Sequence, residues 1–256
     1  MRRKNIALAA DHIQKVYGNQ GTVTRALNDI SFEVGYGEYI SIMGPSGSGK
    51  TTLLNCVSTI DTVSSGHIFL DGKDITALDE EETAEFRRKN LGFVFQDFNL
   101  LDTLTLEENI ALPLTLARRT PSDIKKRVGE VSEKLQIANV LEKFPYQVSG
   151  GQKQRCAFAR AVAGEPKLIM ADEPTGALDF HSSCTLLEIM EKFNREQDTT
   201  ILMVTHDAFC ASFAKRIMFV RDGRIFNEIH RGGKTRELFY HEILDVLSAM
   251  GGDKIC

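Results

Sequence analysis

Long apolar runs are missing from this sequence, and none approaches the roughly twenty residues that a helix needs to span a bilayer. The basic N-terminus, residues 1–5, is not followed by the apolar stretch of a secretion signal. We therefore expect a cytosolic chain, and any link to a membrane must come through a partner protein.

An excess of positive charge is also missing, since 31 Lys and Arg residues and 35 Asp and Glu residues give a formal net charge of −4. This balance disfavours nucleic acid as the main partner, because such binding relies on cations that neutralise phosphates. Internal repeats, low-complexity tracts and long linkers are absent as well. The 256 residues are therefore expected to form one compact α/β domain, or one domain with a subdomain, with a sizeable core.

Cysteine is scarce and scattered, and no two cysteines form a C-x-x-C pair. We interpret these residues as reduced thiols that fill the core and take no part in a metal site. The five cysteines are Cys56, Cys156, Cys184, Cys210 and Cys256.

The sequence does contain a complete phosphate-binding motif, G-x-x-x-x-G-K-[ST], followed by a further threonine. Its residues are Gly44, Pro45, Ser46, Gly47, Ser48, Gly49, Lys50, Thr51 and Thr52. Glycines allow the tight turn that points successive backbone N–H groups at one anion. Lys50 adds a charge that reaches the outer phosphates of a nucleotide, and Thr51 offers a hydroxyl to Mg²⁺.

The surroundings of the motif agree with this interpretation. Residues 39–43 predict a buried strand that enters the loop, and residues 51–57 predict a helix that leaves it. The N-terminus of that helix supplies a further partial positive charge at the phosphate. A chance Gly/Ser-rich turn is the alternative, and a complete motif between a strand and a helix disfavours it.

A second apolar strand, residues 168–172, ends in the carboxylates of Asp172 and Glu173. Open α/β sheets bind ligands at the carboxyl ends of their strands. Asp172 is therefore expected to help hold Mg²⁺, and Glu173 is expected to polarise a water for attack on the terminal phosphate. Taken alone, two acidic residues before Pro174 equally fit a plain turn, but the phosphate motif upstream favours the functional interpretation.

The long interval between Lys50 and Asp172 leaves room for an inserted helical subdomain, which we place at about residues 97–165. One of its predicted helices follows Ser149, Gly150 and Gly151 directly. A helix N-terminus of this kind makes a second anion site. One account of two phosphate-binding helix ends in one chain is that the second faces the nucleotide of another subunit.

The remaining segments complete an α/β fold with a parallel core sheet, an antiparallel β subdomain and the helical insertion. The antiparallel layer is predicted from strands 6–17, 26–34 and 67–70, with turns at 18–21 and 71–72. Parallel crossover units are predicted from strands 39–43, 91–95, 168–171 and 200–204. Helices are predicted at residues 79–89, 105–116, 120–135, 152–163 and 181–196. A hairpin of residues 217–220 and 224–229 and a helix at about 235–250 close the chain.

Over nearly its whole length the chain resembles the ATP-binding cassette (ABC) ATPases, which are P-loop NTPases. The phosphate motif, the strand that ends at Asp172 and Glu173, and residues 148–152 are similar to the two nucleotide motifs and the signature of that family. Val148 stands where the family most often has leucine. Four further matches, in the right order, are Tyr17, Gln96, residues 177–179 and His206.

The resemblance implies a role for each of these residues. Tyr17 resembles the aromatic that stacks on adenine, and Asp179 lies in a segment similar to the loop that crosses the dimer. The implied cofactors are ATP and Mg²⁺. The implied catalytic residues are Glu173, the switch histidine His206 and the loop glutamine Gln96, and the implied metal ligands are Thr51, Gln96 and Asp172. The implied nucleotide contacts are Tyr17, residues 44–52, Ser149, Gly150, Gly151, Gln152 and Asp179.

Each residue taken singly also has a plainer explanation. Tyr17 alone fits an aromatic that packs at a strand end, Gln96 a surface amide, and His206 a capping or core histidine. Only the order and spacing of all the motifs favour the functional interpretation.

A narrower resemblance also exists. Residues 31–52, 95–105 and 172–179 are similar to ATPases of the lipoprotein-release and macrolide-export group. Within that group, residues 99–102 and 232–239 resemble the Bce-type bacitracin-resistance transporters of Gram-positive bacteria. The resemblance implies a homodimer with two ATPs at its interface, bound to a membrane permease on the cytoplasmic face of the cell membrane. It also implies a sensor kinase that is reached through the permease.

Two other functional classes fit part of the pattern. Soluble ABC proteins of DNA repair or translation share these motifs, but they usually carry long coiled coils or two cassettes, which this sequence lacks. A P-loop kinase or GTPase switch would share only the phosphate motif, and the Ser149-Gly150-Gly151 signature and His206 argue against it.

Two apolar features each allow two interpretations. Phe98, Leu100 and Leu101 either anchor their loop to the core or form a groove edge that receives a short helix of the permease. The last predicted helix has an apolar stripe that either packs on the chain's own core or binds a partner. The stripe consists of Phe239, Ile243, Val246, Leu247 and Met250.

Overall fold

The computed structural model describes residues 5–18 and 23–251. Most of the predicted turn at 18–21, the residues that make the N-terminus basic, and Cys256 lie outside these ranges. Within them the predicted strands and helices are confirmed, with shifts of one or two residues at their ends. No helix in the described part of the chain combines the length and apolar character that crossing a membrane requires.

The core of the molecule is a six-stranded sheet in the order β10-β9-β3-β8-β7-β6. Its strands are β3 (Tyr39–Met43), β6 (Leu91–Val94), β7 (Leu168–Asp172), β8 (Ile201–Val204), β9 (Arg216–Arg221) and β10 (Arg224–His230). All neighbours from β6 to β9 run parallel, and only the last hairpin pairs antiparallel. Every residue of β3 is buried, as expected for a parallel strand covered on both faces.

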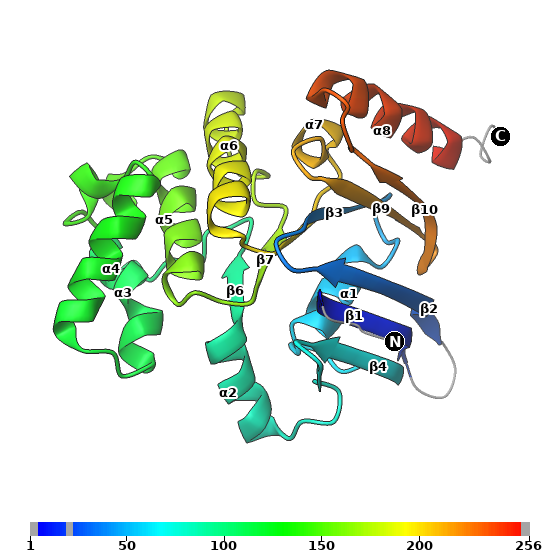
Figure 1. Cartoon of the computed structure of the whole chain (residues 1–256), viewed down its shortest axis with the longest axis horizontal. Helices are drawn as coiled ribbons and strands as arrows, with labels where there is room; N and C mark the ends of the chain where they lie inside the picture. Colours follow the sequence, from blue (N-terminus) through cyan, green and yellow to red (C-terminus); the bar gives the residue numbers. More distant parts are fainter. Residues whose placement is uncertain (1–4, 19–22, 252–256) are drawn as a thin grey trace.

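A second, antiparallel sheet lies beside the first, in the order β2-β1-β4-β5. Its strands are β1 (Ile6–Tyr17), β2 (Thr24–Gly35), β4 (Ser65–Leu70) and β5 (Lys73–Asp74). This sheet is the predicted antiparallel layer. Figure 1 shows β1, β2 and β4 on the opposite side of the molecule from the green helices α3, α4 and α5.

Helices cover the sheets and fill the insertion between β6 and β7. They are α1 (Lys50–Val57), α2 (Glu80–Asn90), α3 (Leu106–Leu116), α4 (Pro121–Lys134), α5 (Gly150–Ala163), α6 (Phe180–Gln197), α7 (Ala208–Ala211) and α8 (Arg236–Gly251). Single 3₁₀ turns lie at Ala138–Val140 and Pro145–Gln147. Several helices begin where the sequence places a cap: Thr105 forms a reciprocal capping box with Glu108, and Thr120 caps a helix that starts with Pro121.

Two apolar clusters hold the layers together, one on each face of the six-stranded sheet. Because side chains alternate along a strand, Tyr39 and Met43 of β3 enter the cluster with α3 to α6, whereas Ile40 and Ile42 enter the cluster with α1 and the antiparallel sheet. Helix α8 joins the first cluster through Phe239, and it brings the apolar stripe with it.

The parallel arrangement also positions the site. The carboxyl ends of β3, β7 and β8 lie at one edge of the sheet, and each is followed by a predicted functional residue.

Candidate functional site

The phosphate-binding loop connects β3 to α1 and makes close backbone contacts that only glycine allows. Gly49 has φ of +103°, and a Cβ there would lie 2.4 Å from the Ala26 carbonyl oxygen. A Cβ on Gly44 would lie 2.1 Å from the Val220 carbonyl oxygen. The loop is therefore pressed against β2 and β9, and its backbone conformation is set by its neighbours.

Lys50 begins α1, and its ammonium group turns back onto the loop. It donates hydrogen bonds to the carbonyl oxygens of Gly44, at 2.9 Å, and Pro45, at 2.8 Å. Burial lowers the pKa of Lys50, while the nearby charges of Glu173 and Asp172 act in the opposite direction. The ammonium thus lies between the loop and the two carboxylates, where a phosphate group would meet it.

The two carboxylates at the end of β7 have different surroundings. Burial raises the pKa of Asp172, the charge of Glu173 raises it further, and Lys50 opposes both effects. Glu173 adopts the left-handed backbone conformation, with φ of +46°. For a residue other than glycine this conformation carries strain, which is typical of functional positions.

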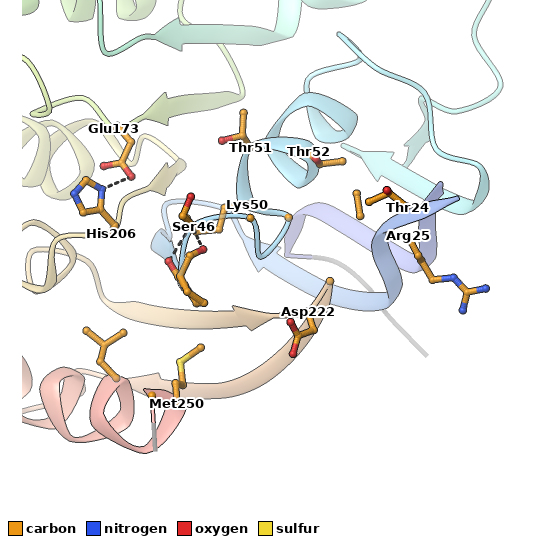
Figure 2. A pocket seen from close by; sticks show the side chains of 18 residues that line it. Thr24, Arg25, Ser46, Lys50, Thr51, Thr52, Glu173, His206, Asp222 and Met250 are labelled. Carbon is orange, nitrogen blue, oxygen red and sulfur yellow. Dashed lines mark hydrogen bonds and ion pairs between the residues drawn. The ribbon is translucent and has the colours of Figure 1, made fainter. Parts of the chain in front are cut away.

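Two neighbours at the end of β8 hold the carboxylate of Glu173 in place. The Thr205 hydroxyl donates to Oε2 at 3.1 Å, and His206 Nδ1 hydrogen bonds to Oε1 at 2.8 Å. Figure 2 shows His206 and Glu173 facing each other beside the phosphate loop. The acceptor atoms of Glu173 are thus directed by side chains from the neighbouring strand.

Lys50, Glu173 and His206 line a cavity of about 940 Å³, whereas Asp172 and Thr205 lie outside its lining. Its volume lies in the range of sites that bind a nucleotide-sized ligand. The predicted site residues that line it are Gly44, Pro45, Ser46, Gly47, Gly49, Lys50, Thr51, Thr52, Glu173 and His206. Ser48, which also belongs to the loop, is buried. Its carbonyl oxygen accepts a hydrogen bond from Gly223 N.

The donor set fits Mg²⁺ held together with phosphates. In the part of the chain that the structure describes, no group of three or more His, Cys, Asp or Glu residues forms a metal cage. Mg²⁺ in proteins usually takes only one or two carboxylates and completes its coordination with phosphate oxygens and water. The hydroxyl of Thr51 and the carboxylate of Asp172, which lies near Lys50, meet that requirement.

The predicted signature residues form a second cluster, outside the cavity. Ser149 caps α5 and exchanges hydrogen bonds with Gln152. Gly151 packs so closely on α6 that a Cβ would lie 2.7 Å from Ser182 Oγ. Ser182 in turn donates from its backbone and its hydroxyl to Asp179, at 2.9 and 2.6 Å. The chain therefore divides its predicted nucleotide contacts between two separate places.

Gln96 and Tyr17 lie near the cavity but do not line it. The side chain of Gln96 packs on Gly176, whose amide donates to the carbonyl oxygen of Glu173. Gln96 thus contacts the loop that carries Glu173. Tyr17 pairs across the antiparallel sheet with Thr24, which does line the cavity.

Three parts of the cavity wall were not predicted from the sequence to line the nucleotide site. They are Thr24, Arg25 and Ala26 at the start of β2, Asp222 and Gly223 in the last hairpin turn, and Leu247 and Met250 of α8. The hairpin turn is docked by backbone hydrogen bonds from Asn28 N to Gly223 O and from Gly223 N to Ser48 O. The Asp-Gly pair predicts a turn. Its contact with the phosphate loop is a tertiary contact, which the local sequence does not predict.

Comparisons with known proteins give a consistent result. Residues 27–176 match the family model described as "ABC transporter". The chain is 52% identical over 246 residues to the ABC transporter ATP-binding protein YxdL of Bacillus subtilis, covering 96% of this chain and 95% of that protein. It is 45% identical to the bacitracin export ATP-binding protein BceA of Halalkalibacterium halodurans, over 96% of this chain and 97% of that one.

A solved structure is also similar. It is an ATP-binding cassette from Methanocaldococcus jannaschii, described as the dimeric structure of a post-hydrolysis state bound to ADP and Pi. The TM-score is 0.81 at 36% sequence identity, and the alignment covers 88% of this chain and 99% of the other.

Proposed function

This chain belongs to the ABC transporter ATP-binding proteins and is an ATP hydrolase, and on that basis we propose that it powers a membrane permease that protects against bacitracin-like antimicrobial peptides. The observation that carries the finer proposal is the 45% identity, along nearly the full length of both chains, to a bacitracin export ATPase. The named relatives are transporter subunits, which disfavours the soluble repair and kinase alternatives.

For hydrolysis we propose that Glu173 is the general base. Thr205 and His206 fix its carboxylate, so that it can accept a proton from a water aligned with the terminal phosphate. Lys50 and the amides of the phosphate loop would bind the phosphates and stabilise charge in the transition state. We assign Thr51 and Asp172 to Mg²⁺, with Gln96 as a further ligand once its loop moves toward the cavity. When bound, Mg²⁺ neutralises charge on the phosphate oxygens.

We further propose that two copies of the chain complete each site together. Ser149, Gly150 and Gly151 lie away from the chain's own cavity, next to Asp179. A head-to-tail dimer with two-fold symmetry would place this cluster over the γ-phosphate bound by the other copy. The similar cassette from Methanocaldococcus jannaschii was solved as a dimer, which supports this arrangement.

The permease is proposed to dock on the insertion of about residues 97–165 and its junction with the core sheet. A hollow of about 290 Å³ lies there, lined by the stacked rings of Phe93 and Phe95 and by apolar side chains of α3 such as Leu112 and Leu116. A short amphipathic helix fits such a groove. The ATPase would then lie on the cytoplasmic face of the membrane, and a sensor kinase would be reached through the permease.

The loop after Gln96 is anchored to the core in one part, and we propose that its exposed part contacts the permease. Leu100 packs against the core, whereas Leu101 is 46% exposed. Arg160 of α5 donates to the carbonyl oxygens of Asn99, at 2.6 Å, and Phe98, at 3.2 Å. A loop that is anchored to the core and carries an exposed leucine can couple movement of Gln96 to movement of a docked helix.

A complementation experiment tests the proposed function. In a strain that lacks the gene, the wild-type chain should restore growth in bacitracin, and Glu173→Gln should not, although it is produced at the same level. In the purified ATPase, Glu173→Gln should reduce turnover by roughly 10²–10⁴-fold while ATP still binds. Unchanged bacitracin sensitivity in the deletion strain would refute the peptide-resistance role, and near-normal turnover would refute the assignment of Glu173.

A further inference from the structure

Beside the nucleotide cavity, the ring of Tyr17 is fixed by hydrogen bonds at its hydroxyl group. The Tyr17 hydroxyl donates to Asp61 Oδ2 at 2.6 Å, and the side chain of Thr52 interacts with the Tyr17 hydroxyl oxygen. Thr52 lines the cavity, as does Thr24, the partner of Tyr17 across the sheet. Tyr17 itself is 41% exposed, so its ring stands at the edge of the cavity with surface open to a ligand.

A buried lysine completes the arrangement. Lys15 is only 8% exposed, and its ammonium donates to Asp61 Oδ1 at 2.5 Å and to the Thr62 carbonyl at 2.6 Å. Lys15 and Tyr17 are two residues apart on β1, so their side chains share one face of the strand. The ammonium lies 4.9 Å from the centre of the Tyr17 ring. One carboxylate thus binds the lysine with one oxygen and the tyrosine with the other.

Thr52 and Asp61, the two residues that contact the Tyr17 hydroxyl, lie at opposite ends of helix α1. Thr52 lies in its first turn, directly after Lys50 and Thr51 of the phosphate loop. Asp61 follows its last turn, where the amides of Ile60 and Asp61 both donate to the Asn55 carbonyl oxygen, at 3.0 and 3.1 Å. The helix that carries the phosphate-binding residues therefore also sets the position of the ring.

We infer that Asp61 and Lys15 are positioning residues for the purine base, because they hold the Tyr17 ring at a fixed place relative to the phosphate loop. The Lys15 ammonium covers one face of the ring, so the base stacks on the opposite face. A ring that is already fixed loses no rotamer freedom when the base stacks on it, which strengthens binding. This inference rests on the proposed ATPase function and on the role that the resemblance to ABC ATPases implies for Tyr17, which is to stack on the base of ATP.

The test compares two ligands on the purified full-length chain, Mg-ATP and Mg-tripolyphosphate, of which only the first has a base. Tyr17→Phe keeps the ring and removes the hydroxyl that bonds to Asp61. Asp61→Asn weakens the same hydrogen bond by replacing the charged acceptor. Each should weaken ATP binding by about 2–10-fold, the worth of one hydrogen bond, and leave tripolyphosphate binding unchanged. Tyr17→Ala removes the ring and should weaken ATP binding by roughly 5–100-fold.

Tyr36→Phe is the matched control. The hydroxyl of Tyr36 also donates to an aspartate, Asp71, but Tyr36 lines a different cavity. Tyr36→Phe should bind both ligands as the wild-type chain does. Tyr17→Phe leaves the Lys15–Asp61 ion pair intact, so it remains informative if Asp61→Asn fails to fold.

The outcomes separate the inference from its premise. Wild-type ATP affinity in Tyr17→Ala would refute the stacking role of Tyr17 and, with it, the inference. Weak ATP binding in Tyr17→Ala, but wild-type binding in Tyr17→Phe and Asp61→Asn, would refute the positioning role alone. Equal losses for ATP and tripolyphosphate would reveal a general structural effect and would also overturn the inference.

Discussion

Replacing Phe239 by alanine tests how α8 is attached to the rest of the chain. Phe239 is 0% exposed and belongs to the larger apolar cluster, together with Ile243 and Met250 of the same helix. Its neighbour Leu238 is 61% exposed. The two residues therefore form a matched pair, because they share a helix turn and differ in burial. Phe239→Ala is the perturbation, and Leu238→Ala is its control.

The expected loss follows from the burial of the ring. Truncating a buried phenylalanine to alanine typically costs about 3–5 kcal/mol, because the lost transfer free energy adds to that of the cavity left behind. An exposed position away from special features changes stability by about 0.5 kcal/mol or less. With a urea dependence of about 3 kcal/mol/M, the unfolding midpoint of Phe239→Ala should fall by roughly 1–2 M, and that of Leu238→Ala should stay near the wild-type value.

The assay is urea unfolding of the isolated subunit, followed by circular dichroism. If the stripe on α8 instead serves a partner, Phe239→Ala keeps the wild-type midpoint and loses binding to the permease in a pull-down. An unchanged midpoint would therefore refute the conclusion that α8 is part of the chain's own core.

Three further predictions concern the phosphate loop, the docking loop and the thiols. Lys50→Ala should remove charge-assisted contacts of about 1.5–3 kcal/mol, so that Mg-ATP no longer raises its melting temperature; full stabilisation would exclude Lys50 as a phosphate ligand. Leu101→Asp should abolish pull-down of the permease without changing ATP binding. The control is Leu238→Asp, because the Leu238 side chain is also exposed. Normal pull-down of the permease by Leu101→Asp would exclude this loop as the docking site. Burial raises the pKa of the thiols Cys56, Cys156 and Cys210 to about 12 each, so at pH 8 only roughly one in ten thousand is a thiolate. In a chain with Cys184→Ser and Cys256→Ser, Ellman's reagent should therefore react only after unfolding, and rapid reaction of the native chain would contradict this burial.

Local signals in the sequence were strong enough to predict most elements. The apolar run of β3 gives a strand buried on both faces, and Thr120 followed by Pro121 indicates a helix cap and the first residue of a helix. Residues that follow parallel strands, such as Glu173 and His206, meet at one edge because strand direction requires it. These parts of the site depend on short-range patterns and on one topological rule.

Contacts between distant segments had no such signal. Three such contacts join segments that come together only in the folded chain. They are the docking of Gly223 on the phosphate loop, the packing of Gln96 on Gly176 and the hydrogen bond of Tyr17 to Asp61. The left-handed backbone conformation of Glu173 could not be predicted from the sequence either, because glutamate has no preference for it. Such features need the completed fold, because no local pattern of residues determines them.

The choice of residue for a test of the signature cluster also depends on the fold. Gly151 tolerates no side chain without displacing Ser182, whereas a Cβ on Gly150 would meet only ordinary contacts, 3.6 Å from Leu178 and 3.8 Å from Phe98. An aspartate at position 150 also suits the first turn of α5, where the helix dipole favours negative charge. Gly150→Asp should therefore leave the fold intact and place a carboxylate where the other copy's γ-phosphate would bind, which electrostatic repulsion disfavours.

The most direct measurement of shared ATP sites is sedimentation velocity of Glu173→Gln with Mg-ATP, with and without Gly150→Asp in the same chain. Glu173→Gln should sediment as a dimer when ATP is present, because ATP binds but is hydrolysed slowly. The double variant should bind ATP with unchanged affinity and remain a monomer. An ATP-induced dimer of the double variant, or loss of ATP binding by its monomer, would contradict a site completed by the second copy.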